Sequence, residues 1–156
     1  MRRKDREVTD FLKMVEIMCA CDCCRLGFVD GDEAYIVPMN FGYDIEGEEI
    51  VLYFHCAEVG RKIDLMAKQN ILSFEMDTGH KLVVGDKAHD FSYLYQCIMG
   101  KGVLEKLSGT SEKAYGLTRI MEHYTGKSDW NIDNNAIDIT AVLKLSVMEW
   151  SCKEHK

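Results

Sequence analysis

A histidine and two adjacent cations lie close together in the segment YFHCAEVGRKID, residues 53–64. His55 ends an apolar, strand-like run, and Arg61 and Lys62 follow Gly60 at the start of a segment with helical spacing. A helix N-terminus carries partial positive charge, so cations there are unfavourable unless an anion binds beside them. Arginine supplies a bidentate fork and lysine a point charge, which together suit a phosphate monoester. The spacing indicates a phosphate site with an imidazole close by.

Each of these residues also has a structural interpretation, which the sequence leaves open. Arg61 and Lys62 can lie in solvent near Glu58 and Asp64, because a misplaced surface cation costs under about 1 kcal/mol. A histidine at a strand end is more often structural than catalytic. An imidazole can nevertheless donate a hydrogen bond or a proton near neutral pH, which makes His55 a candidate catalytic residue.

Seven cysteines form a second chemical feature, and four of them crowd into the segment CACDCC: Cys19, Cys21, Cys23 and Cys24. Zinc and iron–sulfur sites need four converging ligands, usually from two separated pairs or a pair with nearby histidines. The other three are scattered singly: Cys56, Cys97 and Cys152. We expect reduced, mostly buried thiols and no metal site, with metal binding and redox sensing as alternatives.

The composition is that of an ordinary globular domain. Of 156 residues, 47% are hydrophobic and 29% charged, and no apolar run approaches the ~20 residues that a membrane-spanning helix needs. The N-terminal MRRKDREVTDF is followed by no apolar stretch, so we expect a single cytoplasmic domain over residues 1–156, without membrane association. The net charge of −7 and a pI near 5.2 argue against sequence-independent binding to nucleic acid.

The elements that position the histidine and the cations follow from apolar periodicity. A 3.6-residue period predicts a helix over residues 8–18, capped by Asp5 or Thr9. Two further helices are predicted over residues 60–69 and 108–126. Strand-like runs cover six segments: residues 25–29, 34–41, 50–54, 71–76, 91–107 and 139–148.

Turn and edge signals then favour a fold class. The DGD sequence at residues 30–32 predicts a tight turn, and Pro38, which has no N–H, predicts an edge strand or a bulge. Residues 77–90 are expected to form a loop with at most a short strand at 82–84. Because the links between strands are too short for parallel crossovers, we expect a mainly β fold, a small antiparallel barrel with helices on its outside.

Four motifs occur together in one order: MRRKDRE, YIVPMNFGYD, YFHCAEVGRKID and HYTGKSDW. No single motif is unique, but four in register are fairly specific. On these motifs the sequence resembles the FMN-binding split-barrel proteins related to pyridoxamine 5′-phosphate oxidase. Within them it is most similar to the 5-nitroimidazole-resistance (Nim) family, and the likeness spans nearly the whole chain.

The resemblance implies a homodimer of six-stranded antiparallel split barrels, with FMN in clefts at the subunit interface. It places Arg61 and Lys62 at the FMN phosphate, His55 beside the flavin, and Gln96 facing the flavin from a later strand. It also implies two segments in contact with the cofactor. One would lie along the isoalloxazine edge: Pro38, Met39, Asn40 and Phe41. The other would approach the ring and the ribityl chain: His55, Cys56 and Ala57.

One departure from the family pattern bears on activity. The vitamin B6 oxidases carry a late Trp/Arg pair, whereas here Trp150 has no following arginine, which puts vitamin B6 oxidase activity in doubt. The resemblance therefore implies an FMN-dependent oxidoreductase that reduces a small planar acceptor such as a 5-nitroimidazole, with electrons from NAD(P)H or a protein donor. The alternatives are a non-catalytic flavin- or haem-binding carrier or sensor, and a split-barrel domain that has lost its cofactor.

Overall fold

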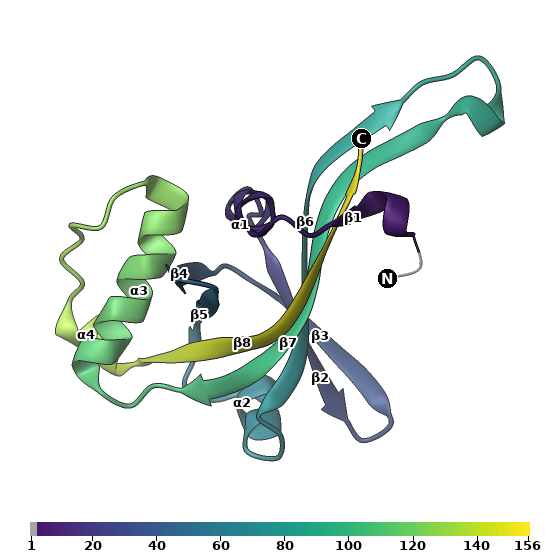
Figure 1. The fold of residues 1–156 in the computed structure, drawn as a ribbon. Helices are drawn as coiled ribbons and strands as arrows, with labels where there is room; N and C mark the ends of the chain where they lie inside the picture. Colours follow the sequence, from purple (N-terminus) through teal and green to yellow (C-terminus); the bar gives the residue numbers. More distant parts are fainter. Residues whose placement is uncertain (1–2) are drawn as a thin grey trace.

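The chain forms one antiparallel sheet, seen in a computed structural model that describes residues 3–156 (Figure 1). Over these residues the sheet has eight strands in the order β3-β2-β6-β7-β8-β5-β4, with β1 pairing separately with β8. The strands are β1 Glu7–Val8, β2 Cys24–Asp30, β3 Glu33–Met39, β4 Gly42–Glu46, β5 Glu49–Ala57, β6 Ile71–Val83, β7 Ser92–Lys106 and β8 Thr140–His155. The helices are η1 Lys4–Arg6, α1 Phe11–Cys19, α2 Arg61–Met66, η2 Ala88–Asp90, α3 Thr110–Thr125 and α4 Asn134–Asp138.

The sheet curls into a barrel that is split along one seam. Its two edge strands, β3 and β4, are consecutive in the chain and are joined only by Asn40 and Phe41, so the curved sheet must bring its two edges together. No ladder joins β3 to β4 or to β5 within residues 3–156. The mainly β, antiparallel barrel predicted from the sequence is confirmed, and Pro38 lies on an edge strand as expected.

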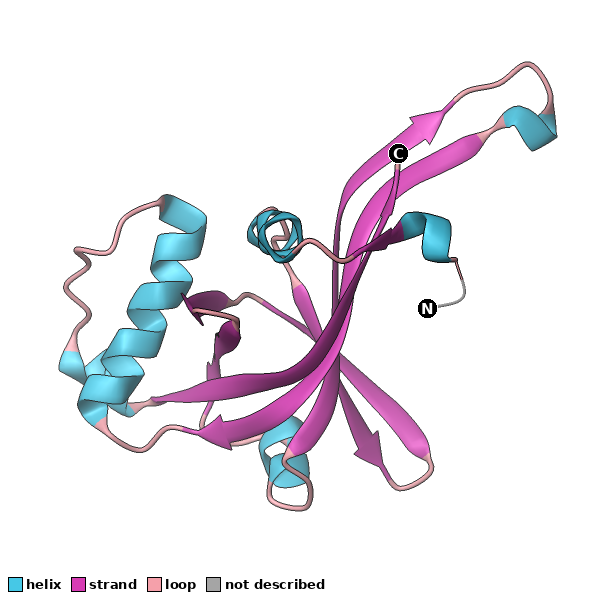
Figure 2. Ribbon diagram, in the orientation of Figure 1, coloured by secondary structure: helices cyan, strands magenta, loops and turns pink. Residues whose placement is uncertain are grey.

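The core fills the inside of the curled sheet. Alternate residues of β2, β5, β6 and β8 point inward, among them Leu26, Phe54, Met76 and Leu145, each at most 1% exposed. Helix α1 covers this interior with Ile17 and Met18, and Figure 2 shows it seated over the curve of the sheet. Burial of this apolar surface is the main force holding the barrel together.

Helix α3 packs on the outside, against β4, β5 and β8 (Figure 2). The approach is so close that a Cβ at Gly42 would lie 2.3 Å from the backbone C of Arg119 and N of Ile120. Only glycine fits there. The helix ends at Gly126, which has the left-handed φ of 69° that the sequence signal predicts. The β3–β4 link is therefore supported by α3, whose backbone contacts the backbone at the start of β4 directly.

Several predicted boundaries were wrong. Helix α1 begins at Phe11 and is capped by the Asp10 carboxylate, not by Asp5 or Thr9, and Val8 belongs to β1. The loop predicted over residues 77–90 is shorter: β6 runs on to Val83 and pairs with β7 as far as Ser92, forming the arm that projects from the body in Figure 1, and only the tip of this arm is loop and η2.

The strand count also differs from the six of the resemblance. The short strands β1 and β4 add two, giving eight in the described part of the chain. The predicted strands over 50–54 and 139–148 extend to Ala57 and His155, because ladder hydrogen bonds continue beyond the apolar runs. The first two residues of the MRRKDRE motif lie outside the described residues.

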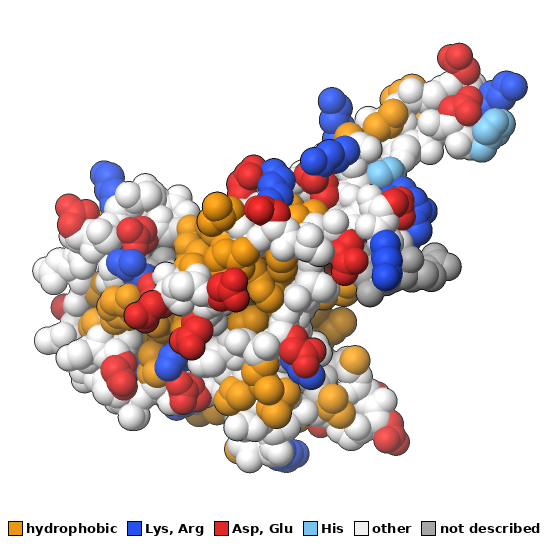
Figure 3. Space-filling model, in the orientation of Figure 1, with side chains coloured by type: hydrophobic (Ala, Val, Ile, Leu, Met, Phe, Trp, Pro, Cys, Tyr) orange, Lys and Arg blue, Asp and Glu red, His pale blue; other side chains and the backbone are white. Residues whose placement is uncertain are grey.

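The surface is mixed in charge. Figure 3 shows acidic and basic side chains interspersed over one face, with apolar side chains gathered in its centre. Among residues 3–156, none of the helices has the length and apolar character required to span a bilayer.

Candidate functional site

A pocket of about 420 Å³ opens at the split in the barrel, and we refer to it as the seam pocket. Its volume is within the range of small-molecule sites. The pocket is lined by four parts of the chain: the end of β3, the end of β5, the start of α2 and the residue before β2. The lining residues are Cys23, Val37, Pro38, Met39, Asn40, His55, Cys56, Ala57 and Lys62.

The strand register explains why these segments meet. Strand β4 begins at Gly42 opposite Tyr53, so the last residues of β5 run past the end of β4. His55, Cys56 and Ala57 therefore pair only with β8 on one side and face the seam on the other. Two segments that are 15 or more residues apart in sequence thus form one cavity.

The side chains of Lys62 and Arg61 have different surroundings. The Lys62 side chain lines the seam pocket and makes no hydrogen bond or ion pair with any side chain of residues 3–156. The Arg61 guanidinium instead lies 2.7 Å from the Asp30 carboxylate and 3.8 Å from Glu33, and stacks 4.4 Å from the Tyr35 ring centroid. The β2–β3 hairpin therefore engages the arginine, and only one of the two predicted cations faces the pocket.

His55 and Cys56 supply the remaining reactive groups of the seam pocket. The His55 ring is exposed and, across the described part of the chain, has no hydrogen-bond partner. Burial raises the pKa of the Cys56 thiol, an effect that nearby Lys62 partly opposes. The thiol is therefore protonated at neutral pH and is a weak nucleophile.

Two further predicted residues lie outside the seam pocket, and one residue that was not predicted lines it. Phe41 is fully buried and packs its ring 4.5 Å from that of His123, so its side chain does not line the seam pocket. Gln96 lies on β7, where its amide donates to Glu154 at 2.6 Å, and it is not among the lining residues. Cys23 does line the pocket, and the sequence assigned it only to the cysteine cluster. The pairing of Cys24 with Met39 brings it there, which no local signal reveals.

The cysteine cluster is largely part of the core. Cys21, Cys24 and Cys152 are buried, and burial raises the pKa of Cys21 to about 12 and that of Cys152 to about 11. All seven cysteines are free thiols. Within residues 3–156, no three His, Cys, Asp or Glu side chains converge to hold a metal ion.

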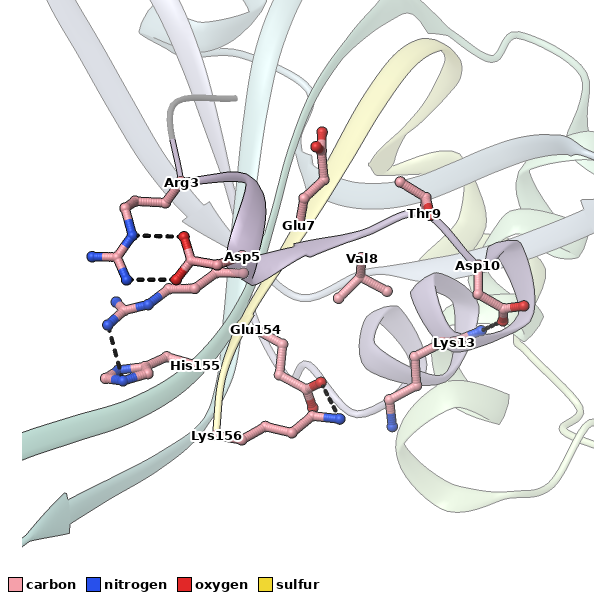
Figure 4. Close-up of a pocket in the computed structure, with 11 residues that line it drawn as sticks. Arg3, Asp5, Glu7, Val8, Thr9, Asp10, Lys13, Glu154, His155 and Lys156 are labelled. Atoms are coloured by element: carbon pink, nitrogen blue, oxygen red, sulfur yellow. Dashed lines mark hydrogen bonds and ion pairs between the residues drawn. The ribbon is translucent and has the colours of Figure 1, made fainter.

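A larger cavity, of about 630 Å³, lies between the N-terminal segment and the end of β8, and we call it the terminal cavity (Figure 4). Two of its cations form ion pairs with carboxylates of the same cavity. Arg3 binds Asp5 at 2.6 Å and Lys156 binds Glu154 at 2.8 Å. Arg6 donates to the Nε2 of His155 at 2.9 Å, since the Nδ1 of that ring can donate to the Tyr93 carbonyl.

A curled antiparallel sheet with a pocket at its seam defines the class of split-barrel proteins. The family described as pyridoxamine 5′-phosphate oxidase matches residues 13–154, and the chain belongs to this family. No curated protein sequence matches the chain.

Solved structures share this fold. The chain is 29% identical to a candidate 5-nitroimidazole antibiotic resistance protein from Bacteroides thetaiotaomicron, with a TM-score of 0.82 over 95% of this chain and 86% of that one. A flavocytochrome from Azotobacter vinelandii is 21% identical, with a TM-score of 0.80 over 100% and 72% of the two chains. An FAD- and haem-binding protein from Mycobacterium smegmatis is 14% identical, with a TM-score of 0.80 over 97% and 74%.

Proposed function

We propose that this protein binds FMN in the seam pocket and uses it to reduce a small planar acceptor such as a 5-nitroimidazole. The observation that carries the proposal is that His55 and Lys62 occur in the same pocket. Both line one pocket, and neither has a side-chain partner within residues 3–156. The family of the chain and its likeness to the candidate nitroimidazole-resistance protein support the choice of cofactor and acceptor.

The residues of the seam pocket fit a flavin nucleotide chemically. Val37, Pro38 and Met39 offer apolar surface to a planar ring, and the Asn40 amide can both donate and accept hydrogen bonds at its edge. The Lys62 ammonium can bind the phosphate as a point charge. Arg61, held by Asp30, is not needed for this role, so we assign the phosphate to Lys62.

We further propose that two copies of the chain form the complete site. A drug-sized ligand is normally buried over most of its surface, whereas the seam pocket of one chain is open to solvent and would leave one side of a planar ring uncovered. A second copy would cover the other side. In such a dimer Gln96 could still face the flavin of the partner subunit, although it lies outside the seam pocket of its own chain.

The flavin supplies the electron transfer, from NAD(P)H or a protein donor to the acceptor. His55 orients the acceptor by donating a hydrogen bond, or a proton, from a ring N–H to an oxygen of the acceptor. The Lys62 Nζ anchors the phosphate, and Pro38 and Met39 exclude water from one side of the ring.

Two measurements test the proposal. The purified protein reconstituted with FMN should show a bound-flavin visible spectrum, and its reduced form should be reoxidised rapidly by a 5-nitroimidazole in stopped flow. His55→Ala should retain FMN but reoxidise about 100-fold more slowly, the size typical of a lost acid–base group. Protein that stays colourless would exclude flavin binding, and bound but unreactive flavin would favour a carrier.

A further inference from the structure

The C-terminal end of α3 binds the link between α1 and β2. The Nε2 of His123 lies 2.9 Å from the carbonyl O of Cys21, and because a carbonyl can only accept, this nitrogen carries the proton and donates. The next residue, Tyr124, donates its hydroxyl proton to the carbonyl O of Asp22 at 2.7 Å. Consecutive side chains of the HYTGKSDW motif thus bind consecutive carbonyls.

The same hydroxyl also binds the link between the two edge strands. The backbone N–H of Phe41 donates to the Tyr124 Oη at 3.2 Å. The Phe41 ring is fully buried against that of His123, which holds the link in place. One phenolic oxygen therefore bridges two backbone segments that are about 20 residues apart in the chain.

Both bridged residues adjoin the wall of the seam pocket. Asp22 immediately precedes Cys23, and Phe41 immediately follows Asn40; Cys23 and Asn40 both line the pocket. Burial raises the pKa of Tyr124, an effect that the nearby Asn40 side chain and the hydrogen bond from the Phe41 N–H partly offset, so the hydroxyl keeps its proton at neutral pH.

We propose that Tyr124, seated by His123, is a positioning residue of the seam pocket. Its hydroxyl fixes the separation between the Cys23 wall and the Asn40 wall, and with it the shape that the pocket presents to a planar ligand. The identity of that ligand rests on the proposed function, whereas the bridge itself belongs to the protein without cofactor.

The test compares two tyrosines of one helix. Tyr124→Phe removes only the bridging hydroxyl, while Tyr115→Phe makes the same change at a ring that packs 5.9 Å from Tyr53 instead. In FMN titrations followed by flavin fluorescence, Tyr124→Phe should weaken binding about 5- to 10-fold, the size of one or two backbone hydrogen bonds. Tyr115→Phe should stay within about twofold of wild type.

A second readout needs no flavin. The rate at which iodoacetamide modifies Cys23 in the protein without cofactor, measured by peptide mass spectrometry, should rise several-fold in Tyr124→Phe and not in Tyr115→Phe. Changes in both the Cys23 rate and the FMN affinity, confined to Tyr124→Phe, would support the proposal. Wild-type behaviour in both would overturn it.

The two proposals can fail separately. If the wild-type protein binds no FMN, the proposed function fails, while the Cys23 rate still tests the bridge. If Tyr124→Phe does not fold, His123→Gln keeps an N–H donor for the Cys21 carbonyl and His123→Leu does not. Only His123→Leu should then raise the Cys23 rate, and equal rates in the two variants would overturn the proposal.

Discussion

The seam pocket and the terminal cavity differ in how their charges are satisfied. The terminal cavity is the larger, about 630 Å³ against about 420 Å³, and two of its cations, Arg3 and Lys156, are bound by carboxylates of the same cavity. The seam pocket holds an imidazole and an ammonium group that no side chain of residues 3–156 binds. A group whose interactions are already made has little to offer a ligand, so unsatisfied chemistry identifies a site better than volume does.

The largest expected effect tests the scaffold behind the seam pocket. Gly42→Ala would place a Cβ 2.3 Å from the α3 backbone. Backbone atoms cannot rotate away as a side chain can, so the whole helix would have to shift. We expect a loss of about 3 kcal/mol or more in the free energy of unfolding, measured by urea denaturation. Gly27→Ala is the matched control, because its Cβ would meet only the Ser73 carbonyl at 3.5 Å and should cost under about 0.5 kcal/mol. Similar losses in the two variants would show that α3 is not a rigid support.

The next effect tests the cation that lines the seam pocket, Lys62. Lys62→Ala should weaken FMN binding about 10- to 100-fold, since a charge-assisted hydrogen bond contributes about 1.5–3 kcal/mol. Arg61→Ala, which removes the neighbouring cation already bound by Asp30, should change the affinity by less than about twofold. The reverse order, measured by the same fluorescence titration, would move the phosphate from Lys62 to Arg61.

A smaller effect concerns the thiols. Because the pKa of Cys56 is raised by burial, its alkylation by iodoacetamide should be slow at pH 7 and should still be accelerating above pH 9. Free FMN at ten times its Kd should slow this reaction about tenfold if the thiol lies in the occupied pocket. Cys97 also has a raised pKa but lies on β7 outside the pocket, so its rate should not respond to FMN. Equal protection of both thiols would indicate a general stabilisation instead.

The smallest effect is expected in the terminal cavity. Asp5→Asn breaks the pair with Arg3 but should leave FMN affinity within about twofold and the melting temperature within about 2 °C, because the pair is exposed. The Arg3 guanidinium holds the pKa of Asp5 at about 2, below that of the unfolded chain. The Arg3–Asp5 pair therefore stabilises the folded protein at pH values above about 4, the pKa of Asp5 in the unfolded chain. The small difference in stability between Asp5→Asn and wild type should disappear as the pH falls towards 2. A large loss of FMN affinity would mean that this cavity, not the seam pocket, holds the ligand.

Local sequence signals gave most of the fold. The strand that leads to His55 was predicted, although it continues to Ala57; the edge position of Pro38 and the end of α3 at Gly126 were predicted correctly. These features depend on side-chain periodicity and on backbone preferences, which are properties of neighbouring residues. The continuation of β6 to Val83 was missed, because it depends on a ladder with β7 that polar residues can also form.

The sequence by itself brought His55 and Lys62 together, because only seven positions separate them along the chain. Only the tertiary structure decided that Cys23 joins them, that Arg61 turns to Asp30, and that Gln96 lies outside the seam pocket. An ionic side chain selects its partner among all charges within reach in space. Which charges lie within reach depends on how distant strands pair, so the strand register determines the partner and no short segment of the chain can reveal it.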